Sequence, residues 1–271
     1  MSVEGVPAAV SIQEIVGDSP ALKRTFKQAM KIAAQDTPVL IVGEPGSGKE
    51  SLARAIHRIS SRRHESFVKV SCQTATSTVL ENKLFGHESR VPAHTASLQP
   101  RRTGLASLDL AHNGVLFLDE IAQAPLHLQA KLLSILEHGE FEPIGEAHRV
   151  RVDVRLMATT NKDLKACVAQ HLFLEDLYLR LSKCSIHVPP LRERRDDIPL
   201  LAYYFIRKFG RRSDKNIKHI PDSTMRLLTQ AYWPGNIRQL EVLIEQAVAF
   251  TDGLELRLPN FGDDEDRVVN A

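Results

Sequence analysis

Residues 38–50 decide the fold of this chain and read Pro-Val-Leu-Ile-Val-Gly-Glu-Pro-Gly-Ser-Gly-Lys-Glu. The apolar run at 39–42 has the length of a strand, and its lack of alternation is typical of a strand buried on both faces of a parallel sheet. The next seven residues, Gly43 to Lys49, match the phosphate-binding pattern G-x-x-x-x-G-K, and a helical pattern follows. Strand, glycine loop and helix in this order predict a nucleotide phosphate site.

The chemistry of this loop (the P-loop) depends on its glycines and its lysine. Glycines let the backbone turn tightly, so that its N–H groups point at the phosphates, and the following helix adds the positive end of its dipole. The Lys49 ammonium would reach the β and γ oxygens. Glu50 stands where most P-loop proteins place Ser or Thr for the metal. The expected nucleotide contacts are Gly43, Glu44, Pro45, Gly46, Ser47, Gly48, Lys49 and Glu50.

A second apolar run, residues 115–118, ends in Asp119 and Glu120. Ligands of parallel α/β sheets bind at the carboxyl edge, where these two acids would lie. An acidic pair alone more often marks a surface turn, but combined with the P-loop it predicts a site for ATP and Mg²⁺. Asp119 would hold Mg²⁺, directly or through water, and Glu120 would orient the attacking water.

The rest of the chain alternates between strand and helix and then becomes helical. Strand-like runs at residues 67–70, 154–159 and 185–188 are separated by helical patterns, which predicts an α/β fold with a doubly wound parallel sheet. Beyond Pro189-Pro190 we expect only helices, at 198–209, 222–232 and 236–250. These predict a small C-terminal all-helical lid.

The expected organisation has four parts. They are a lead-in segment at 1–16, an α/β nucleotide-binding domain at 17–190, a helical lid at 191–253 and an acidic, mobile tail at 254–271.

Three amphipathic helices can be placed with their buried faces. The helix after Ser19-Pro20 should bury Leu22, Phe26, Met30 and Ala33. The helix after the P-loop should bury Leu52, Ile56 and Ile59, and a helix at 126–138 should bury Leu128, Leu132, Ile135 and Leu136.

Composition narrows the class of protein. The chain has 271 residues and a formal net charge of +2, which gives no overall attraction to nucleic acid. Its 3 cysteines form no C-x-x-C pair, which argues against a disulfide framework or zinc site and favours a reducing cytosol. No apolar run is long enough to span a bilayer and no signal-peptide pattern is present, so a cytoplasmic protein without a membrane partner is expected.

Four further stretches and the acidic-pair strand occur in one order: Phe85-Gly86-His87-Glu88, Leu116–Glu120, Ala158-Thr159-Thr160-Asn161, Glu175-Asp176-Leu177-Tyr178 and Trp233-Pro234-Gly235-Asn236-Ile237-Arg238. Together with the P-loop, this series resembles the AAA+ domain of sigma-54-dependent transcriptional activators (bacterial enhancer-binding proteins). The resemblance covers about residues 15–251. In that family Glu commonly follows the P-loop lysine, so Glu50 agrees with the pattern.

The resemblance implies roles for three more residues. Asn161 resembles the polar sensor after the fourth strand, although an Asn there could instead cap the next helix. Arg238 resembles the second sensor, which touches nucleotide from the lid; the alternative is a surface ion pair. Arg180 resembles a finger arginine at the subunit boundary, a type of residue that can contribute about 10³–10⁵ in rate. A finger supplied by a neighbour implies self-assembly into a hexamer or similar ring.

The sequence also departs from the family at three places. The sigma-contact loop Gly-Ala-Phe-Thr-Gly-Ala is replaced by residues 90–95, Arg-Val-Pro-Ala-His-Thr, which lack the aromatic tip and both glycines. Leu174 replaces a second finger arginine, and a Leu cannot supply bidentate charge stabilisation. Ser71 replaces the family's Asn at the end of the second strand. We therefore expect ATP binding without conventional sigma-54 contact and with weak hydrolysis.

Three hypotheses about function remain open. The leading one is an ATP-binding AAA+ module of a transcriptional regulator, in which nucleotide controls self-assembly. The others are an active sigma-54-remodelling ATPase, and a non-catalytic partner subunit in a ring of active paralogues. Expected partners are thus other copies of the chain and the transcription machinery or a paralogous AAA+ regulator. No DNA-binding motif is found after Gly253, and the lid and sensor motifs argue against a metabolic kinase.

Overall fold

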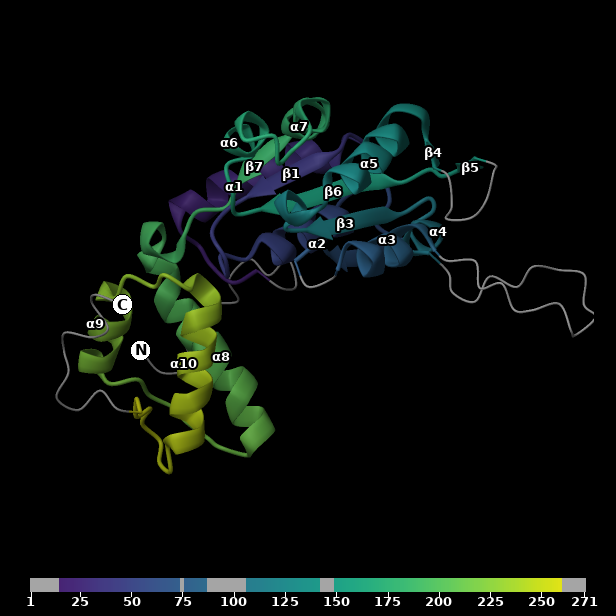
Figure 1. Cartoon of the computed structure of the whole chain (residues 1–271). Coiled ribbons are helices and arrows are strands. Elements are labelled where there is room, and N and C mark those ends of the chain that lie inside the picture. The colour runs from purple at the N-terminus through teal and green to yellow at the C-terminus, as the bar shows by residue number, and fades with distance from the viewer. Residues whose placement is uncertain (1–14, 74–75, 87–105, 142–148, 260–271) are drawn as a thin grey trace, which may run out of the picture. The chain divides into compact units, whose positions relative to one another are not determined.

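The computed structural model describes residues 15–73, 76–86, 106–141 and 149–259 (Figure 1). The described chain divides into two compact units. The lid unit contains residues 15–28, 43–55 and 187–259, and the sheet unit contains residues 29–42, 56–73, 76–86, 106–141 and 149–186. The P-loop therefore groups with the helical lid.

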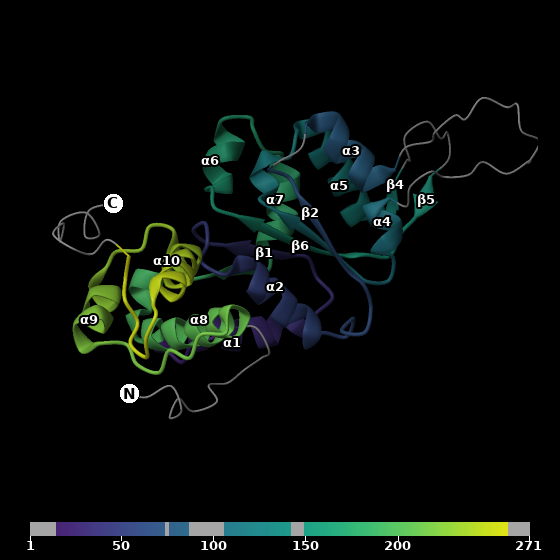
Figure 2. The ribbon, with the colours of Figure 1, turned by 90° about the horizontal axis from the view of Figure 1, so that it is seen from below.

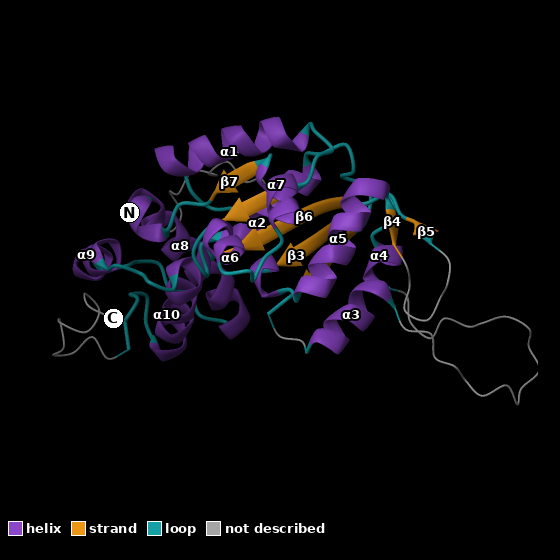
Figure 3. Ribbon diagram, turned by 45° about the horizontal axis from the view of Figure 1, so that its top comes forward, coloured by secondary structure: helices purple, strands orange, loops and turns teal. Residues whose placement is uncertain are grey.

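The sheet has five strands in the order β2-β3-β6-β1-β7. Figure 3 shows β3, β6 and β7 among them. The strands are β1 (Val39–Val42), β2 (Phe67–Ser71), β3 (Val115–Asp119), β6 (Arg155–Thr160) and β7 (Ser185–His187). The pairs β2/β3, β3/β6 and β1/β6 are parallel, and their register sets Ser71 opposite Asp119. The predicted strands and the predicted α/β class are confirmed. The central strands β1, β3 and β6 are mostly or fully buried, whereas the edge strands β2 and β7 each bury one residue.

Helices α3 to α7 contribute to one large apolar cluster with the sheet, which includes the buried helix residues Leu84, Leu132 and Leu177 and the strand residues Leu116 and Leu156. On β3, Phe117 stacks with Phe67 of β2. The helices are α3 (Ser77–Phe85), α4 (Ser107–Leu110), α5 (Leu126–His138), α6 (Leu164–Ala169) and α7 (Glu175–Ser182). The remaining elements here are the 3-10 turn η2 (Ile121–Gln123) and a hairpin of β4 (Glu140–Phe141) and β5 (Val150–Arg151).

Two predicted helix faces need correction. In α1 (Pro20–Ala33) the buried stripe runs through Leu22, Thr25 and Ala29, whereas Met30 is 55% exposed. The small Thr and Ala residues follow the helical period on the packed side, and the more apolar Met30 lies about 100° further round the helix. In α2 (Lys49–Arg58) the predicted face also fails at its end, because Ile59 follows the last helical residue and is 40% exposed.

The lid has its own core. Helices α8 (Ile198–Ser213), α9 (Asp222–Gln230) and α10 (Asn236–Phe250) lie together (Figure 2), preceded by the 3-10 turns η3 (Leu191–Glu193) and η4 (Arg195–Asp197). Their shared core includes Ile206, Trp233, Leu240 and Ile244. Leu256 is also part of this core and is 1% exposed, so residues 254–259 extend the lid beyond the boundary expected at 253.

The start of α1 is held by a residue far along the chain. The Asp197 carboxylate is completely buried and accepts hydrogen bonds from the backbone N–H groups of Asp18 (2.6 Å) and Ser19 (2.8 Å). It also accepts a bond from the Ser19 hydroxyl at 2.8 Å. A carboxylate at this position satisfies N–H groups that a helix start leaves unpaired, and it complements the helix dipole.

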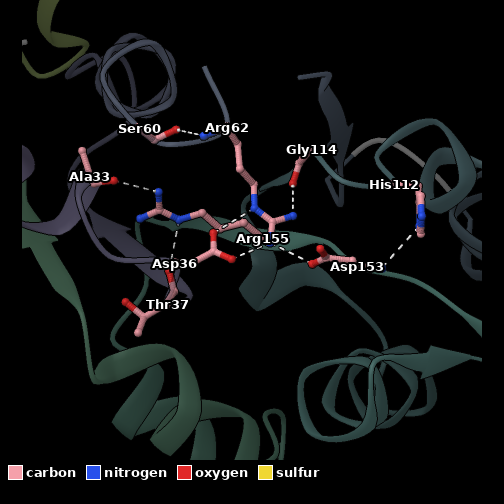
Figure 4. Close-up of polar contacts among 9 residues, drawn as sticks. All are labelled: Ala33, Asp36, Thr37, Ser60, Arg62, His112, Gly114, Asp153 and Arg155. Atoms are coloured by element: carbon pink, nitrogen blue, oxygen red, sulfur yellow. Dashed lines mark hydrogen bonds and ion pairs between the residues drawn. The ribbon is translucent and has the colours of Figure 1, made fainter. Parts of the chain in front are cut away.

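The amino edge of the sheet is held by buried Arg155 (Figure 4). Its guanidinium donates to the carbonyls of Ile32 (2.9 Å), Ala33 (3.4 Å) and Thr37 (3.2 Å). Burial lowers the pKa of Arg155, and its three carbonyl partners lie in the last turn of α1 and in the segment between α1 and β1.

Arg62 is the second arginine that links elements at the amino edge of the sheet (Figure 4). It pairs with the carboxylates of Asp36 and Asp153 and donates to the carbonyl of Gly114 at 3.2 Å. The two arginines thereby join the end of α1 to the first residues of β3 and β6. The predicted site residues Asp119 and Glu120 lie at the opposite, carboxyl ends of the strands.

Candidate functional site

The P-loop has a backbone that only glycine accommodates. Gly46 and Gly48 have φ angles of 73° and 102°, in the region that favours glycine. A Cβ at Gly46 would lie 2.3 Å from the carbonyl oxygen of Gly235. The loop therefore passes directly against the lid, and any side chain at position 46 would displace it.

Lys49 is the first residue of α2 and is 7% exposed. Its ammonium donates to the carbonyl of Gly43 at 2.9 Å and to that of Glu44 at 3.3 Å. A buried ammonium at a helix start, held over a glycine loop, is an arrangement suited to an anionic phosphate group. These residues fit the phosphates of a nucleotide.

Glu44 is bound by two lid residues, Arg192 and Asn236, and these three form what we name the Glu44 cluster. Both carboxylate oxygens receive a guanidinium N–H of Arg192, at 2.6 and 2.8 Å. The Asn236 amide donates to the same carboxylate at 3.0 Å. The Arg192 hydrogen bonds, helped by Asn236 and opposed by desolvation, hold the pKa of Glu44 at about 2.

Further lid residues hold the other positions of the loop. Buried Arg194 donates to the carbonyl of Ser47 at 2.5 Å, and the backbone N–H of Ile237 donates to the carbonyl of Gly46 at 3.0 Å. The Cβ of Arg238 would lie 3.1 Å from a Cβ at Gly46. The predicted second sensor, Arg238, is thus beside the P-loop, with an exposed side chain.

The acidic pair at the end of β3 is organised by Thr159. The Thr159 hydroxyl donates to Asp119 Oδ1 at 2.7 Å and accepts the backbone N–H of Glu120 at 3.0 Å. Glu120 is 8% exposed and has a left-handed backbone, with φ 58°, which is strained for a non-glycine residue. The Lys69 ammonium lies 3.8 Å from the other Asp119 oxygen.

Asn161 contacts Glu120 through its backbone. Its N–H donates to Glu120 Oε2 at 2.9 Å, while its side chain is exposed. Helix α6 is capped by Asp163, whose carboxylate accepts the N–H of Lys165, so the alternative role for Asn161 as the cap of that helix is not supported. Ser71, opposite Asp119, accepts the N–H of Gln73 at 3.3 Å.

Arg180 and Leu174 lie at the two ends of α7. The Arg180 guanidinium pairs with Glu137 of α5 at 2.9 Å and remains 41% exposed. Leu174 is the N-cap residue of α7, packs partly buried against the sheet core, and donates its N–H to the Gln129 side chain at 2.8 Å. An apolar, packed side chain therefore occupies the position at which the family resemblance leads us to expect a finger arginine.

Two other polar groups near the predicted site have local roles. Glu50 pairs with Arg54 one helical turn later, at 2.9 Å. Burial, aided by the charges of Asp119 and Glu120, raises the pKa of the Cys72 thiol to about 12. Cys72 is consequently a protonated, buried thiol.

The structure thus brings the predicted residues into two groups, apart from Arg180, which pairs with Glu137. The first joins the P-loop and Arg238 in the lid unit, and the second joins Asp119, Glu120 and Asn161 in the sheet unit. Sequence reasoning missed Arg192 and Arg194, and assigned Thr159 and Asn236 only to motifs. The signals available were the charged run at 192–197 after two prolines, and a polar residue ending an apolar strand.

Two predictions receive no test from these contacts. Residues 90–95, the predicted degenerate contact loop, lie outside the described residues. Among the residues that the structure covers, no three or more His, Cys, Asp or Glu side chains gather as a metal site, so Mg²⁺ at Asp119 stays a prediction. No helix in the described ranges is long and apolar enough to cross a membrane.

The parallel sheet, the P-loop and the helical lid define the AAA+ class of P-loop proteins. The chain belongs to the Sigma-54 interaction domain family, whose profile matches residues 15–187. The AAA+ ATPase lid domain profile matches residues 192–264. These matches confirm the resemblance to sigma-54-dependent activators.

Similar curated proteins include a transcriptional activator and a regulatory protein. The chain is 47% identical over 249 residues to the formate hydrogenlyase transcriptional activator FhlA of Escherichia coli K12, covering 91% of this chain and 35% of FhlA. It is 46% identical over 239 residues to the regulatory protein AtoC of the same organism, covering 88% of this chain and 51% of AtoC. The chain thus spans between about a third and a half of these relatives' length.

Solved structures support the fold. A crystal structure of NtrX from Brucella abortus in complex with ATP matches with a TM-score of 0.80 and 36% identity. The match covers 94% of this chain and 53% of the NtrX chain. A second NtrX structure, in complex with ADP, also gives a TM-score of 0.80.

Proposed function

We propose that this chain is an ATP-binding AAA+ module of a transcriptional regulator, in which nucleotide controls self-assembly and hydrolysis is weak. The observation that carries the proposal is the P-loop, with Lys49 buried at the start of α2 and the glycines fixed against the lid. The NtrX relative that was crystallised with ATP supports ATP as the nucleotide. The proposed domain boundaries are residues 16 and 190, with a lid that begins at 191 and is proposed to include Leu256 and Leu258, beyond the boundary expected at 253.

Mg²⁺ would be held by Asp119, whose carboxylate Thr159 orients at the end of β3. Bound there with the nucleotide, the ion would neutralise charge on the phosphates. Glu120 would hold the attacking water, and its contact with the Asn161 N–H fixes the carboxylate at the end of β6. Arg238 would contact nucleotide from the lid.

Weak hydrolysis follows from two replacements. Leu174 offers no guanidinium where the family supplies a finger, and Ser71 offers only a short hydroxyl, which binds the N–H of Gln73. Arg180 would be the remaining finger, acting on the nucleotide of a neighbouring copy in a hexamer or similar ring. Its half-exposed side chain is compatible with that role.

We further propose that the chain makes no conventional sigma-54 contact, because residues 90–95 lack the aromatic tip and the glycines. The second candidate, an active sigma-54-remodelling ATPase, is favoured by the family match and by intact Glu120 and Arg180. Nucleotide-dependent trapping on sigma-54 distinguishes the two. A third candidate, a non-catalytic partner subunit, is favoured by Leu174 and predicts co-purification with a paralogue.

The first test is ATP binding and steady-state turnover as a function of protein concentration, with Lys49→Ala as the blank. Binding above the blank, with turnover that is low and rises more than linearly, supports a weak ring-forming ATPase with Arg180 acting between copies. Binding without turnover supports the partner subunit. Binding no better than the blank would overturn the proposed function.

A further inference from the structure

We propose that the Glu44 cluster positions the P-loop for phosphate binding, so that ATP affinity depends on the contact of Glu44 with Arg192 and Asn236. This inference rests on the proposed function, since it concerns the same nucleotide site. It adds positioning residues that the sequence motifs do not name. Arg192 and Asn236 lie 148 and 192 residues after Glu44 in the chain.

The geometry of the Arg192 contact is specific. The guanidinium donates to both oxygens of Glu44, at 2.6 and 2.8 Å, and this two-point contact fixes the plane of the carboxylate. The guanidinium also lies 4.9 Å from the centre of the Tyr232 ring. Arg192 is thus held from two sides, and Glu44 is the part of the P-loop that it holds.

Asn236 makes the second contact, and its position requires an asparagine. It is completely buried with a left-handed φ of 54°, a conformation that Asn tolerates better than most residues. Its Oδ1 accepts the N–H of Leu191 at 2.7 Å, while its Nδ2 donates to Glu44 at 3.0 Å and to the Pro45 carbonyl at 3.1 Å. The amide therefore joins the entrance of the lid to the first two variable residues of the P-loop.

The charges explain why the cluster must stay complete. An unpaired carboxylate at position 44 would repel a triphosphate in the same loop. Arg192 neutralises that charge, and the Glu44 carboxylate stays ionised and paired in neutral solution because hydrogen bonds favour its charged form. Losing Arg192 should therefore harm nucleotide binding more than losing the Glu44 charge.

This reasoning predicts an order of affinities. Glu44→Gln loses the charge-assisted contacts and should bind ATP and ADP about 10-fold more weakly. Arg192→Gln loses them too and leaves a carboxylate beside the phosphates, so we expect a loss of at least about 30-fold. The double variant removes that carboxylate and should return to the level of Glu44→Gln alone.

The lid offers a matched control in Glu241→Gln. Glu241 pairs with Lys208 at 2.6 Å, and its side chain is 33% exposed, compared with 38% for Glu44. The pair joins α8 to α10, two helices of the lid core. The substitution removes the same charge from a similar ion pair and should leave the affinity within about 2-fold.

The experiment titrates the whole chain and its variants with fluorescent ATP and ADP analogues, and measures thermal unfolding without nucleotide. Support requires Glu241→Gln to match the wild type, Glu44→Gln and the double variant to be weaker, and Arg192→Gln to be weakest. If Arg192→Gln fails to fold, Arg192→Lys takes its place in the experiment. It keeps the positive charge but loses the two-point contact, so its nucleotide affinity should match that of Glu44→Gln.

Three results would overturn the inference while leaving the proposed function intact. They are wild-type affinity in Glu44→Gln, an Arg192→Gln variant that binds more tightly than the double variant, and an equal loss of affinity in Glu241→Gln. Because nucleotide affinity is measured on folded protein, a purely structural role of the cluster would lower the unfolding temperature alone. Wild-type binding no better than Lys49→Ala would instead overturn the proposed function, and this inference with it.

Discussion

Replacing Thr159 by Val tests how the acidic pair is held. Thr159 is completely buried, and its hydroxyl connects the Asp119 carboxylate at 2.7 Å with the N–H of Glu120 at 3.0 Å. Valine keeps the branched shape and fits β6, but it can neither donate nor accept a hydrogen bond. Both contacts are therefore lost with little change in side-chain shape.

The magnitude follows from the two lost bonds. A hydrogen bond to a charged group contributes about 1.5–3 kcal/mol, and a buried N–H left without an acceptor costs about 1–3 kcal/mol. The Asp119 side chain is 28% exposed, so water can replace part of the first contact. We expect Thr159→Val to lower the free energy of unfolding by about 2–3 kcal/mol.

Urea denaturation measures the loss of stability, and the Mg²⁺ dependence of ATP affinity measures whether Asp119 is still oriented for the ion. Thr160→Val is the matched control, because Thr160 is equally buried but its hydroxyl bonds only within the turn, to the N–H and carbonyl of Lys162 at 3.0 and 3.2 Å. Thr159→Val should lose the Mg²⁺ dependence and Thr160→Val should keep it. A Thr159→Val variant as stable as the wild type, or an equal Mg²⁺ response in both variants, would refute the reasoning.

Three further predictions concern single positions. Leu174→Arg should raise steady-state ATP turnover by at least about 10-fold if the missing finger limits hydrolysis, and an unchanged rate would contradict the account of weak turnover. Cys72 has a pKa raised to about 12 and is 3% exposed, so in the folded protein iodoacetamide should modify half-buried Cys184 but not Cys72, as mass spectrometry can measure. Modification of Cys72 before unfolding would contradict its assigned environment. Glu44 has a folded pKa of about 2, below its unfolded value, so its stabilising contribution is complete above about pH 4.5 and falls as the pH drops toward 2. Urea titrations at neutral and acidic pH should show that the difference in the free energy of unfolding between wild type and Glu44→Gln becomes smaller in acid. A difference that grows in acid would contradict the lowered pKa of Glu44.

The sheet and the lid could be predicted from the sequence because their signals are local. Apolar runs such as residues 115–118 identify buried strands, and helix α5 was predicted with its observed bounds, Leu126–His138. The P-loop was found in the same way, since its residues are contiguous. Burial on α1 was predicted less well, because hydrophobicity favoured Met30 while close packing selected Thr25 and Ala29.

The contacts around the site could not be predicted in this way. Glu44 reads as a variable position of the glycine motif, and its partners Arg192 and Asn236 are separated from it by most of the chain. Charged residues after a proline pair are usually solvated, so nothing local marks Arg192 or Arg194 as P-loop partners. Such pairings depend on tertiary packing, which residue spacing does not encode.

The long-range hold on the P-loop has a consequence during protein synthesis. The Ser47 carbonyl accepts its hydrogen bond from Arg194, which is synthesised 147 residues later. At about 5–20 residues per second, a ribosome needs roughly 7–30 s to add that stretch. During this interval the nascent chain displays a glycine loop without its partners, so nucleotide should not assist the folding of the N-terminal half before the lid has emerged.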